Sequence, residues 1–120
     1  MANLKEKAIS LLGSTSAVDM QTVASTTLYT VPTGKVAYIT HVVVRDPSAS
    51  MAGGPDYDFT NWKQTVSLAT LTTLGTDYIV LDGNNTKYTE LAAATNFQIS
   101  VITGTTAACT ATIDVFGYLV

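Results

Sequence analysis

The sequence predicts an all-β protein: an antiparallel β-sandwich, jelly-roll-like, with a short N-terminal helical or extended arm. Threonine fills 21 of the 120 positions and valine is also abundant, and both residues favour pleated, half-buried strands. Runs of β-branched and aromatic residues recur at spacings of about 8–12 residues between turn signals, which is typical of sandwiches and barrels. No second helix alternates with these runs, so the pattern excludes a parallel α/β sheet.

The arm is the one helix-like segment. Within residues 2–12, Leu4, Ile9 and Leu12 belong to an apolar set at helical spacings, and Gly13 ends the pattern. A helix of this length is marginal in water, so it needs a surface to pack against, either on its own domain or on a neighbouring subunit.

The length suits one ordinary domain. We assign residues 1–16 to the arm and a polar connector, and residues 17–120 to a single β-sandwich domain. The predicted strands of that domain are, in order, residues 18–24, 26–31, 35–45, 63–74, 78–81, 86–91, 96–103 and 108–119.

The strongest of these strands is residues 35–45, which are β-branched or aromatic almost throughout. A turn at residues 32–34, Pro-Thr-Gly, separates it from the strand before it. Strict alternation places two apolar sets on opposite faces: Val36, Tyr38, Val42 and Val44 on one, and Ala37, Ile39 and Val43 with His41 on the other. A strand with two apolar faces is covered on both sides, or partly covered by the arm.

The middle of the chain is the least regular. Residues 46–55 hold two prolines and a Gly-Gly pair, which indicates a loop. Three aromatic residues follow in an acidic, turn-like stretch: Tyr57, Phe59 and Trp62. Residues 63–74 then alternate apolar and polar, and the short strands at 78–81 and 86–91 flank an Asp-Gly-Asn-Asn turn.

The last two strands alternate cleanly, and each has a predicted inward face. In residues 96–103 that face carries Phe97, Ile99 and Val101, and in residues 108–119 it carries Cys109, Ala111, Ile113 and Val115.

Charge and cysteine content exclude several classes of protein. Six basic residues against nine acidic ones, a net charge of −3, leave no basic stripe for nucleic acid. No apolar run is long enough to span a membrane or to form a signal-peptide core. A single cysteine forms no intrachain disulfide. We therefore expect a protein made and folded in a cytoplasm.

Candidate catalytic and metal-binding residues are few, and we expect no cofactor and no enzyme activity. His41 lies among valines in mid-strand, which favours a structural or interface role. Cys109 has only alanines nearby to influence its thiol, so it is predicted to be a small buried apolar residue. Asp46, Asp56 and Asp58 flank the long loop; they are interpreted as solvated acids, with metal binding left open.

Two features point to binding surfaces. Tyr57, Phe59 and Trp62 either stack on a sugar or fill a partner's pocket, or else Phe59 and Trp62 close one end of the sandwich. The second feature is the low charge, 12% of residues, because the centres of protein interfaces are depleted in charged residues.

The segment TTLYTVPTGKVAYITHVVVR, residues 26–45, resembles a strand–turn–strand opening found in small β-sandwich virion proteins of tailed bacteriophages. In those proteins a Leu-Tyr-Thr-Val-Pro-x-Gly-Lys stretch leads into a long strand. The resemblance implies a capsid or tail accessory protein, often a trimer, without enzymatic activity. Capsid cement (decoration) proteins of this kind clamp neighbouring capsomers, while fibre and baseplate modules bind other virion parts or host glycans.

The functional hypothesis is therefore a virion structural protein, a capsid cement protein made in the host cytoplasm and placed on the capsid surface. Its partners are further copies of itself, with a trimer favoured, and the major capsid protein or another virion protein. The candidate partner-binding residues are Leu4, Ile9 and Leu12 of the arm together with Tyr57, Phe59 and Trp62. The alternative is a glycan- or receptor-binding module of a tail fibre or baseplate, which uses the aromatic group as a stacking platform.

Overall fold

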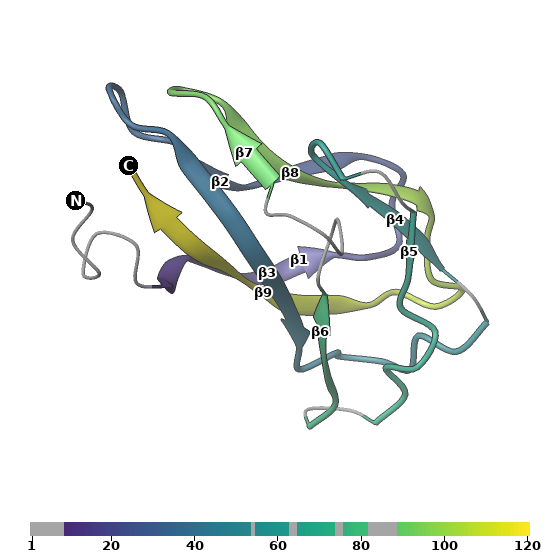
Figure 1. Ribbon diagram of the computed structural model, residues 1–120. Helices are drawn as coiled ribbons and strands as arrows, with labels where there is room; N and C mark the ends of the chain where they lie inside the picture. Colours follow the sequence, from purple (N-terminus) through teal and green to yellow (C-terminus); the bar gives the residue numbers. More distant parts are fainter. Residues whose placement is uncertain (1–8, 54, 63–64, 74–75, 82–88) are drawn as a thin grey trace.

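Two antiparallel sheets pack against each other in the computed structural model, which describes residues 9–53, 55–62, 65–73, 76–81 and 89–120 (Figure 1). These residues contain no helix, and therefore none long and apolar enough to cross a membrane. The strands are β1 (Ser10–Asp19), β2 (Ser25–Thr30), β3 (Ala37–Arg45), β4 (Asp56–Phe59), β5 (Val66–Ser67), β6 (Tyr78–Leu81), β7 (Thr89–Leu91), β8 (Asn96–Thr103) and β9 (Thr110–Leu119). The predicted antiparallel β-sandwich is confirmed.

The first sheet has the strand order β1-β9-β3-β6, and β9 lies between β1 and β3 (Figure 1). Strands β6 and β7 pair with the same side of β3 at its opposite ends, β7 with residues 37–39 and β6 with residues 42–45. The second sheet has the order β2-β8-β4-β5. Among the described strands, β4 and β5 are the one hydrogen-bonded pair adjacent in the chain.

The core lies between the two sheets and is built from their inward-facing side chains. Strands β6 and β8 have the predicted bounds. The inward faces predicted for the last two strands are also confirmed, since all of their members are buried: Phe97, Ile99, Val101, Cys109, Ala111, Ile113 and Val115.

The sequence predicts a helical or extended arm, and residues 10–16 are extended and form the first part of β1. The helical pattern is therefore wrong for residues 10–12, and the separate connector is wrong for residues 13–16. Strand β1 pairs with β9 along its length, with Ser10 opposite Gly117 and Asp19 opposite Thr110. Two irregularities interrupt the register, one between Leu11 and Gly13 and one farther along β1. The first displaces the alternation at Leu11 and Leu12, the two members of the apolar pattern that lie in β1. Residues 1–8 of the predicted arm lie outside the described residues.

The middle of the chain also departs from expectation. Residues 56–59, predicted as turn-like, form β4, with Tyr57 and Phe59 pointing into the core. Within the predicted strand 63–74 the structure shows only the short β5, while residues 63, 64 and 74 lie outside the described residues. Leu68 and Leu71 are buried outside any strand, where backbone hydrogen bonds hold them: Leu68 N donates to Pro55 O, and Leu71 O accepts from Met51 N.

A bulge at Thr40 changes which side chains of β3 face the core. The register between β3 and β9 shifts between Ile39 and His41. As a result Tyr38 points outward although Val42 and Val44 are buried, and the prediction that these three share a face is wrong. The extra residue at a bulge inverts the faces of everything beyond it.

Candidate functional site

The aromatic group predicted as a binding platform lies mostly in the core. Tyr57 is fully buried, and its hydroxyl donates a hydrogen bond of 2.9 Å to the carbonyl of Met20. Burial raises the pKa of the Tyr57 hydroxyl above its ordinary value. Phe59 is also buried, with its ring centroid 4.6 Å from that of Trp62 and 5.8 Å from that of Phe97. Neither Tyr57 nor Phe59 presents a ring face to solvent, because both lie on the inward side of β4.

Trp62 is half-buried and packs against this cluster from the edge. Its indole Nε1 is buried and has no hydrogen-bond partner among the described residues. Tyr57 and Phe59 are therefore core residues, and Trp62 packs against that core.

Two of the three predicted arm residues lie in the described part of the chain. Leu4 lies outside the described residues. Ile9, directly before β1, is 51% exposed, whereas Leu12 is partly buried against the core. Of these two, Ile9 is the more available to a partner.

His41 and Cys109 occupy different environments. His41 lies on the outside of the first sheet, where its ring stacks on Phe116 with centroids 4.6 Å apart and planes at 8°; its Nδ1 is 3.0 Å from the hydroxyl of Thr40. Cys109 is buried as predicted, with its Sγ 3.5 Å from the carbonyl oxygen of Ala49.

The three loop carboxylates are dispersed. Asp46 is bonded to Arg45 at 2.8 Å, and Asp58 accepts a hydrogen bond of 2.9 Å from the hydroxyl of Thr65. Within the described ranges, no three His, Cys, Asp or Glu side chains gather as metal ligands would.

The outer face of the first sheet is unusually apolar for a surface, and it contains no residue from the predicted binding set. We call it the aromatic face. The strand registers place these side chains on it: Leu11 and Ser14 of β1; Thr112, Asp114, Phe116 and Tyr118 of β9; Tyr38, His41, Val43 and Arg45 of β3; and Tyr78 and Val80 of β6. On the same side of the sheet the exposed Glu90 of β7 lies opposite Tyr38 and borders the face.

Cross-strand pairs order the aromatic face into rows. Tyr38 and Tyr118 are opposite each other and stack with centroids 5.1 Å apart. The next row is the stacked pair of His41 and Phe116, which Leu11 extends on β1. Aromatic pairs of this kind add about 0.5–1.5 kcal/mol beyond the burial of their area. The rings are therefore held in fixed orientations before any partner arrives.

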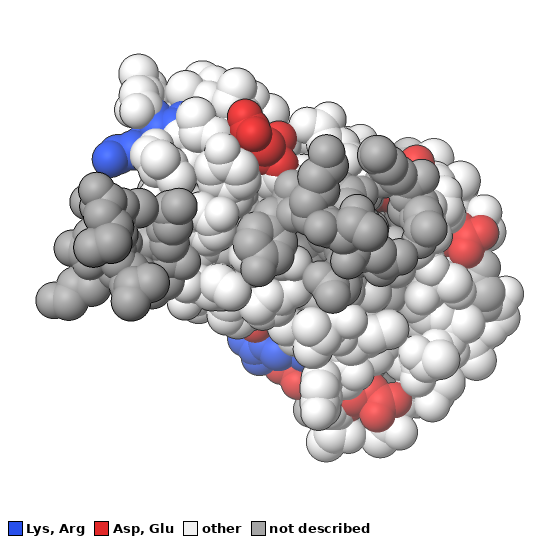
Figure 2. Space-filling model, viewed as in Figure 1, with Lys and Arg blue, Asp and Glu red and all other residues white. Residues whose placement is uncertain are grey.

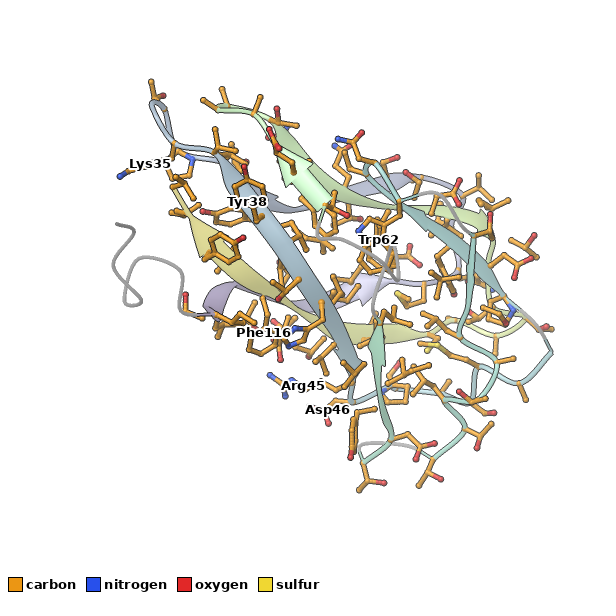
Figure 3. The ribbon with its side chains drawn as sticks, in the orientation of Figure 1. Lys35, Tyr38, Arg45, Asp46, Trp62 and Phe116 are labelled. Atoms are coloured by element: carbon orange, nitrogen blue, oxygen red, sulfur yellow. The ribbon has the colours of Figure 1, made fainter. Side chains whose placement is uncertain are left out.

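The rest of the face combines aliphatic side chains with one charged cluster. Val43 lies opposite Val80, and Arg45 lies opposite Tyr78. Figure 3 shows Phe116 and Arg45 projecting on the side of β3 and β9 that faces away from Trp62. Leu11 and Val80 are each 54% exposed and Tyr78 is 69% exposed, so the two edge strands of the sheet carry its most accessible apolar residues.

Arg45 pairs with both acidic groups of the charged cluster, which keeps one net negative charge. Its Nε donates to Asp114 and its terminal nitrogen to Asp46, each at 2.8 Å. Asp114 also accepts a hydrogen bond of 2.6 Å from the hydroxyl of Ser14. Burial favours a neutral Asp114, but the bonds from Arg45 and Ser14 outweigh it and hold the pKa of that carboxyl below its ordinary value of 3.8.

A pH prediction follows from this cluster. Because the pKa of Asp114 is lowered on folding, the unfolded chain binds more protons as the pH falls below about 4. The stability contributed by the carboxylate is therefore complete above that range and is lost as the pH falls through the lowered pKa. The pKa values of Asp19 and Asp77 are also lowered, because each carboxylate accepts backbone hydrogen bonds.

We expect Asp114→Asn to lower the free energy of unfolding by about 1–3 kcal/mol at pH 7, because a charge-assisted bond is lost beside a partly buried guanidinium. Between pH 5 and pH 2.5, the free energy of unfolding is expected to fall less for Asp114→Asn than for the wild type. Urea unfolding at a fixed protomer concentration measures both effects. Equal acid dependence of the two proteins would contradict the role given to Asp114.

The outer face of the second sheet has a different character. Its side chains pair with one another through hydroxyls and amides: Ser25 with Ser100 at 2.8 Å, Gln98 with Thr27 at 3.1 Å and Thr30 with Asn96 at 2.8 Å. We call this surface the hydroxyl face. The view in Figure 2 shows how few charged groups the surface carries, in small separate clusters. Ile102 near the end of β8, 45% exposed, is an apolar residue on this side. The two sheets thus present one mainly polar and one mainly apolar exterior.

The sequence alone does little to distinguish the residues of the aromatic face from core residues. Its members follow the same apolar pattern as the buried residues, and the bulge at Thr40 decides which of them point outward. The one signal in advance was that residues 35–45 are apolar on both faces.

Comparison with known proteins gives a likeness in fold. No protein-family model matches the sequence, and no curated protein sequence is significantly similar to it. One solved structure, a chain from the "Cyanophage Pam1 capsid asymmetric unit", superposes with a TM-score of 0.55 at 15% sequence identity. The match covers 94% of this chain and 86% of that chain, so nearly all of the sandwich takes part in it.

Proposed function

We propose that this protein is a non-enzymatic structural protein of a bacteriophage virion, a cement (decoration) protein that forms a trimer and stabilises the head shell. Its partners are copies of itself and the major capsid protein, and its place is the capsid surface. The observation that carries the proposal is the likeness in fold, over 94% of the chain, to a chain of a cyanophage capsid asymmetric unit.

The strand order supports the proposal. Strand β1 pairs with β9 and β2 with β8, while β3 and β4 lie beyond those partners in their respective sheets. This is the order of a double-sheet jelly roll, a fold common in viral capsid proteins. We class the sandwich as a jelly roll on this ground, and fold class by itself does not assign a function.

The surface of the molecule supports self-association. A single soluble domain rarely exposes a large contiguous apolar patch unless the patch binds something. The aromatic face is such a patch, and 15 charged side chains in the whole chain leave much of the exterior uncharged. The glycan-binding alternative gains no such support, because Tyr57 and Phe59 are buried.

We expect light scattering to give three times the chain mass for the purified protein. We expect the protein to co-sediment with heads of its phage that have been prepared without it. A monomer that fails to sediment with the heads would contradict the proposal. Binding to a glycan in place of the heads would favour the tail-module alternative.

The arm is tested by deleting residues 1–8. This deletion leaves β1 complete, whereas a cut after residue 13 would remove pairs between β1 and β9. We expect the shortened protein to fold and to form trimers but to bind heads more weakly, because Leu4 and the neighbouring apolar residues would lie across a capsid neighbour. Unchanged binding to heads would contradict a role for the arm.

A further inference from the structure

We infer that the aromatic face is the surface through which one copy of this chain binds a second copy. The inference deepens the self-association of the proposed function and rests on it. It assigns that contact to one side of the sandwich and leaves the hydroxyl face outside the contact.

The first observation that supports the inference is the contrast between the two outer faces. On the hydroxyl face, polar groups already satisfy one another across the strands, as between Ser25 and Ser100. On the aromatic face, most side chains are apolar or aromatic and gain free energy when water is removed from them. Interfaces are enriched in Tyr, Phe, Met and Arg and depleted in Lys and Glu; the aromatic face has Tyr, Phe and Arg and no Lys, and one Glu, Glu90, borders it.

The size of the aromatic face fits a contact between two proteins of this kind. Its three most exposed apolar residues and five half-buried ones present on the order of 500 Å² of apolar and aromatic surface, close to the largest patch on an ordinary monomer. A standard interface takes about 800 Å² from each partner, somewhat more than half of it non-polar. The apolar area of the face thus matches the non-polar part of one such contact, and in a ring of three, where each copy makes two contacts, it is divided between them.

The charges on this face favour a second copy over a charged partner. Arg45 is bonded to both Asp114 and Asp46, and His41 is stacked on Phe116. Arg45 is the one Lys or Arg that the registers place on the face, and two carboxylates already hold it, so a nucleic acid or an acidic peptide finds no free cation along the apolar rows. The paired cluster keeps one net negative charge, and Glu90 on the edge strand β7 adds another. A copy of the same face offers matching aromatic and aliphatic rows, and a contact between those rows leaves the exposed carboxylates of Asp46 and Glu90 in water.

The position of the apolar rows fits a closed ring of copies. Two different rows reach the two edges of the sheet: Leu11 on β1 lies in the row with Phe116 and His41, and Val80 on β6 lies in the row with Val43 and Asp114. The two edges therefore differ, with aromatic rings inward of Leu11 and the aliphatic Val43 inward of Val80. Contacts between unlike surfaces repeat around a rotation axis and close into a ring. Three copies related in this way place the β1 side of one face against the β6 side of the next.

The experiment compares Val80→Glu with Val23→Glu by light scattering and sedimentation over a range of protein concentrations. Val80 is on the aromatic face and 54% exposed; Val23 is outside it and 71% exposed, so both variants add the same charge at an accessible valine. We expect Val80→Glu to raise the dissociation constant of the oligomer by roughly 100-fold or more, because a carboxylate is buried without a partner. Val23→Glu is expected to assemble like the wild type.

Leu11→Glu serves as a second variant on the opposite edge, and circular dichroism with urea unfolding establishes that each variant is folded. Oligomers of both face variants that match the wild type would overturn the inference while leaving the proposed function intact. An equal rise in the dissociation constant for Val23→Glu would also overturn it. So would an oligomer that becomes monomeric when residues 1–8 are deleted but stays assembled in both face variants. A monomeric wild type would instead contradict the self-association in the proposed function.

Discussion

Phe97→Ala is expected to lower the free energy of unfolding by about 3–5 kcal/mol, a large part of the stability of a domain of this size. Phe97 on β8 is fully buried and its ring lies near those of Phe59 and Trp62, with centroids 5.8 and 6.1 Å away. Truncation to alanine removes the apolar area of the ring and leaves a cavity. The surrounding rings cannot collapse into it, because two sheets hold the backbone on either side.

Phe116→Ala is the matched control for this prediction. Phe116 is also a stacked phenylalanine, but it lies half-buried on the aromatic face. We expect it to destabilise the folded protomer less than Phe97→Ala does and to weaken self-association more. Urea unfolding and light scattering at one protomer concentration separate the two effects. A larger loss of unfolding free energy for Phe116→Ala than for Phe97→Ala would show that the core has been placed on the wrong side of the sheet.

Gly117→Ala is expected to destabilise the protein by about 3 kcal/mol or more, or to prevent folding, although alanine is the smallest possible addition. A Cβ at Gly117 would overlap the carbonyl oxygen of Tyr38 and come within 3.1 Å of the Cα of Ile39. Both are backbone atoms, which no rotamer change can move. The close approach arises beside the bulge at Thr40, where β3 moves toward β9, and a strand glycine commonly marks such a place.

Gly13→Ala provides a graded comparison, because a Cβ there would lie 3.1 Å from the carbonyl oxygen of Leu28. A shift of a few tenths of an ångström relieves that contact, so a smaller loss of stability is expected. Thermal unfolding of both variants, at equal protomer concentration, measures the difference. Near-equal melting temperatures for Gly117→Ala and the wild type would mean that the two strands are not in this register.

The sequence predicts the strands best where alternation is uninterrupted. Strand β8 reads Phe97, Ile99, Val101 with polar residues between, and its bounds agree with prediction at both ends. The end of β9 is predicted to the residue, as are the bounds of β6. In each of these strands one face is buried along its whole length, so side-chain period and strand pairing carry the same information.

The elements that sequence reasoning misses are those with bulges or those that are too short to show a period. A bulge between Leu11 and Gly13 interrupts the alternation at the start of β1, where the predicted helical pattern ends, and the four residues of β4 give too few repeats to reveal alternation between acidic neighbours. In both cases the pairing partner, β9 or β8, fixes the conformation. Such tertiary control of local structure is not visible in a short window of sequence.

The candidate binding residues show the same limit. Tyr57, Phe59 and Trp62 attract attention because they are aromatic and close together, yet the strand that carries two of them points them inward. The aromatic face is assembled from four strands, and its members lie as far apart in the chain as Leu11 and Phe116, which are opposite each other in the sheet. Only the sheet order brings them together.

The central position of β9 in the first sheet also determines when this protein can fold. Strand β9 supplies the hydrogen-bonded neighbour of both β1 and β3, so neither of those pairings exists until the ribosome has released residues 110–119. Most other pairings between described strands also join distant parts of the chain, and such topologies fold slowly, in milliseconds to seconds. The nascent chain therefore carries its apolar strands uncovered through most of synthesis. Folding then occurs after translation of β9, in competition with aggregation.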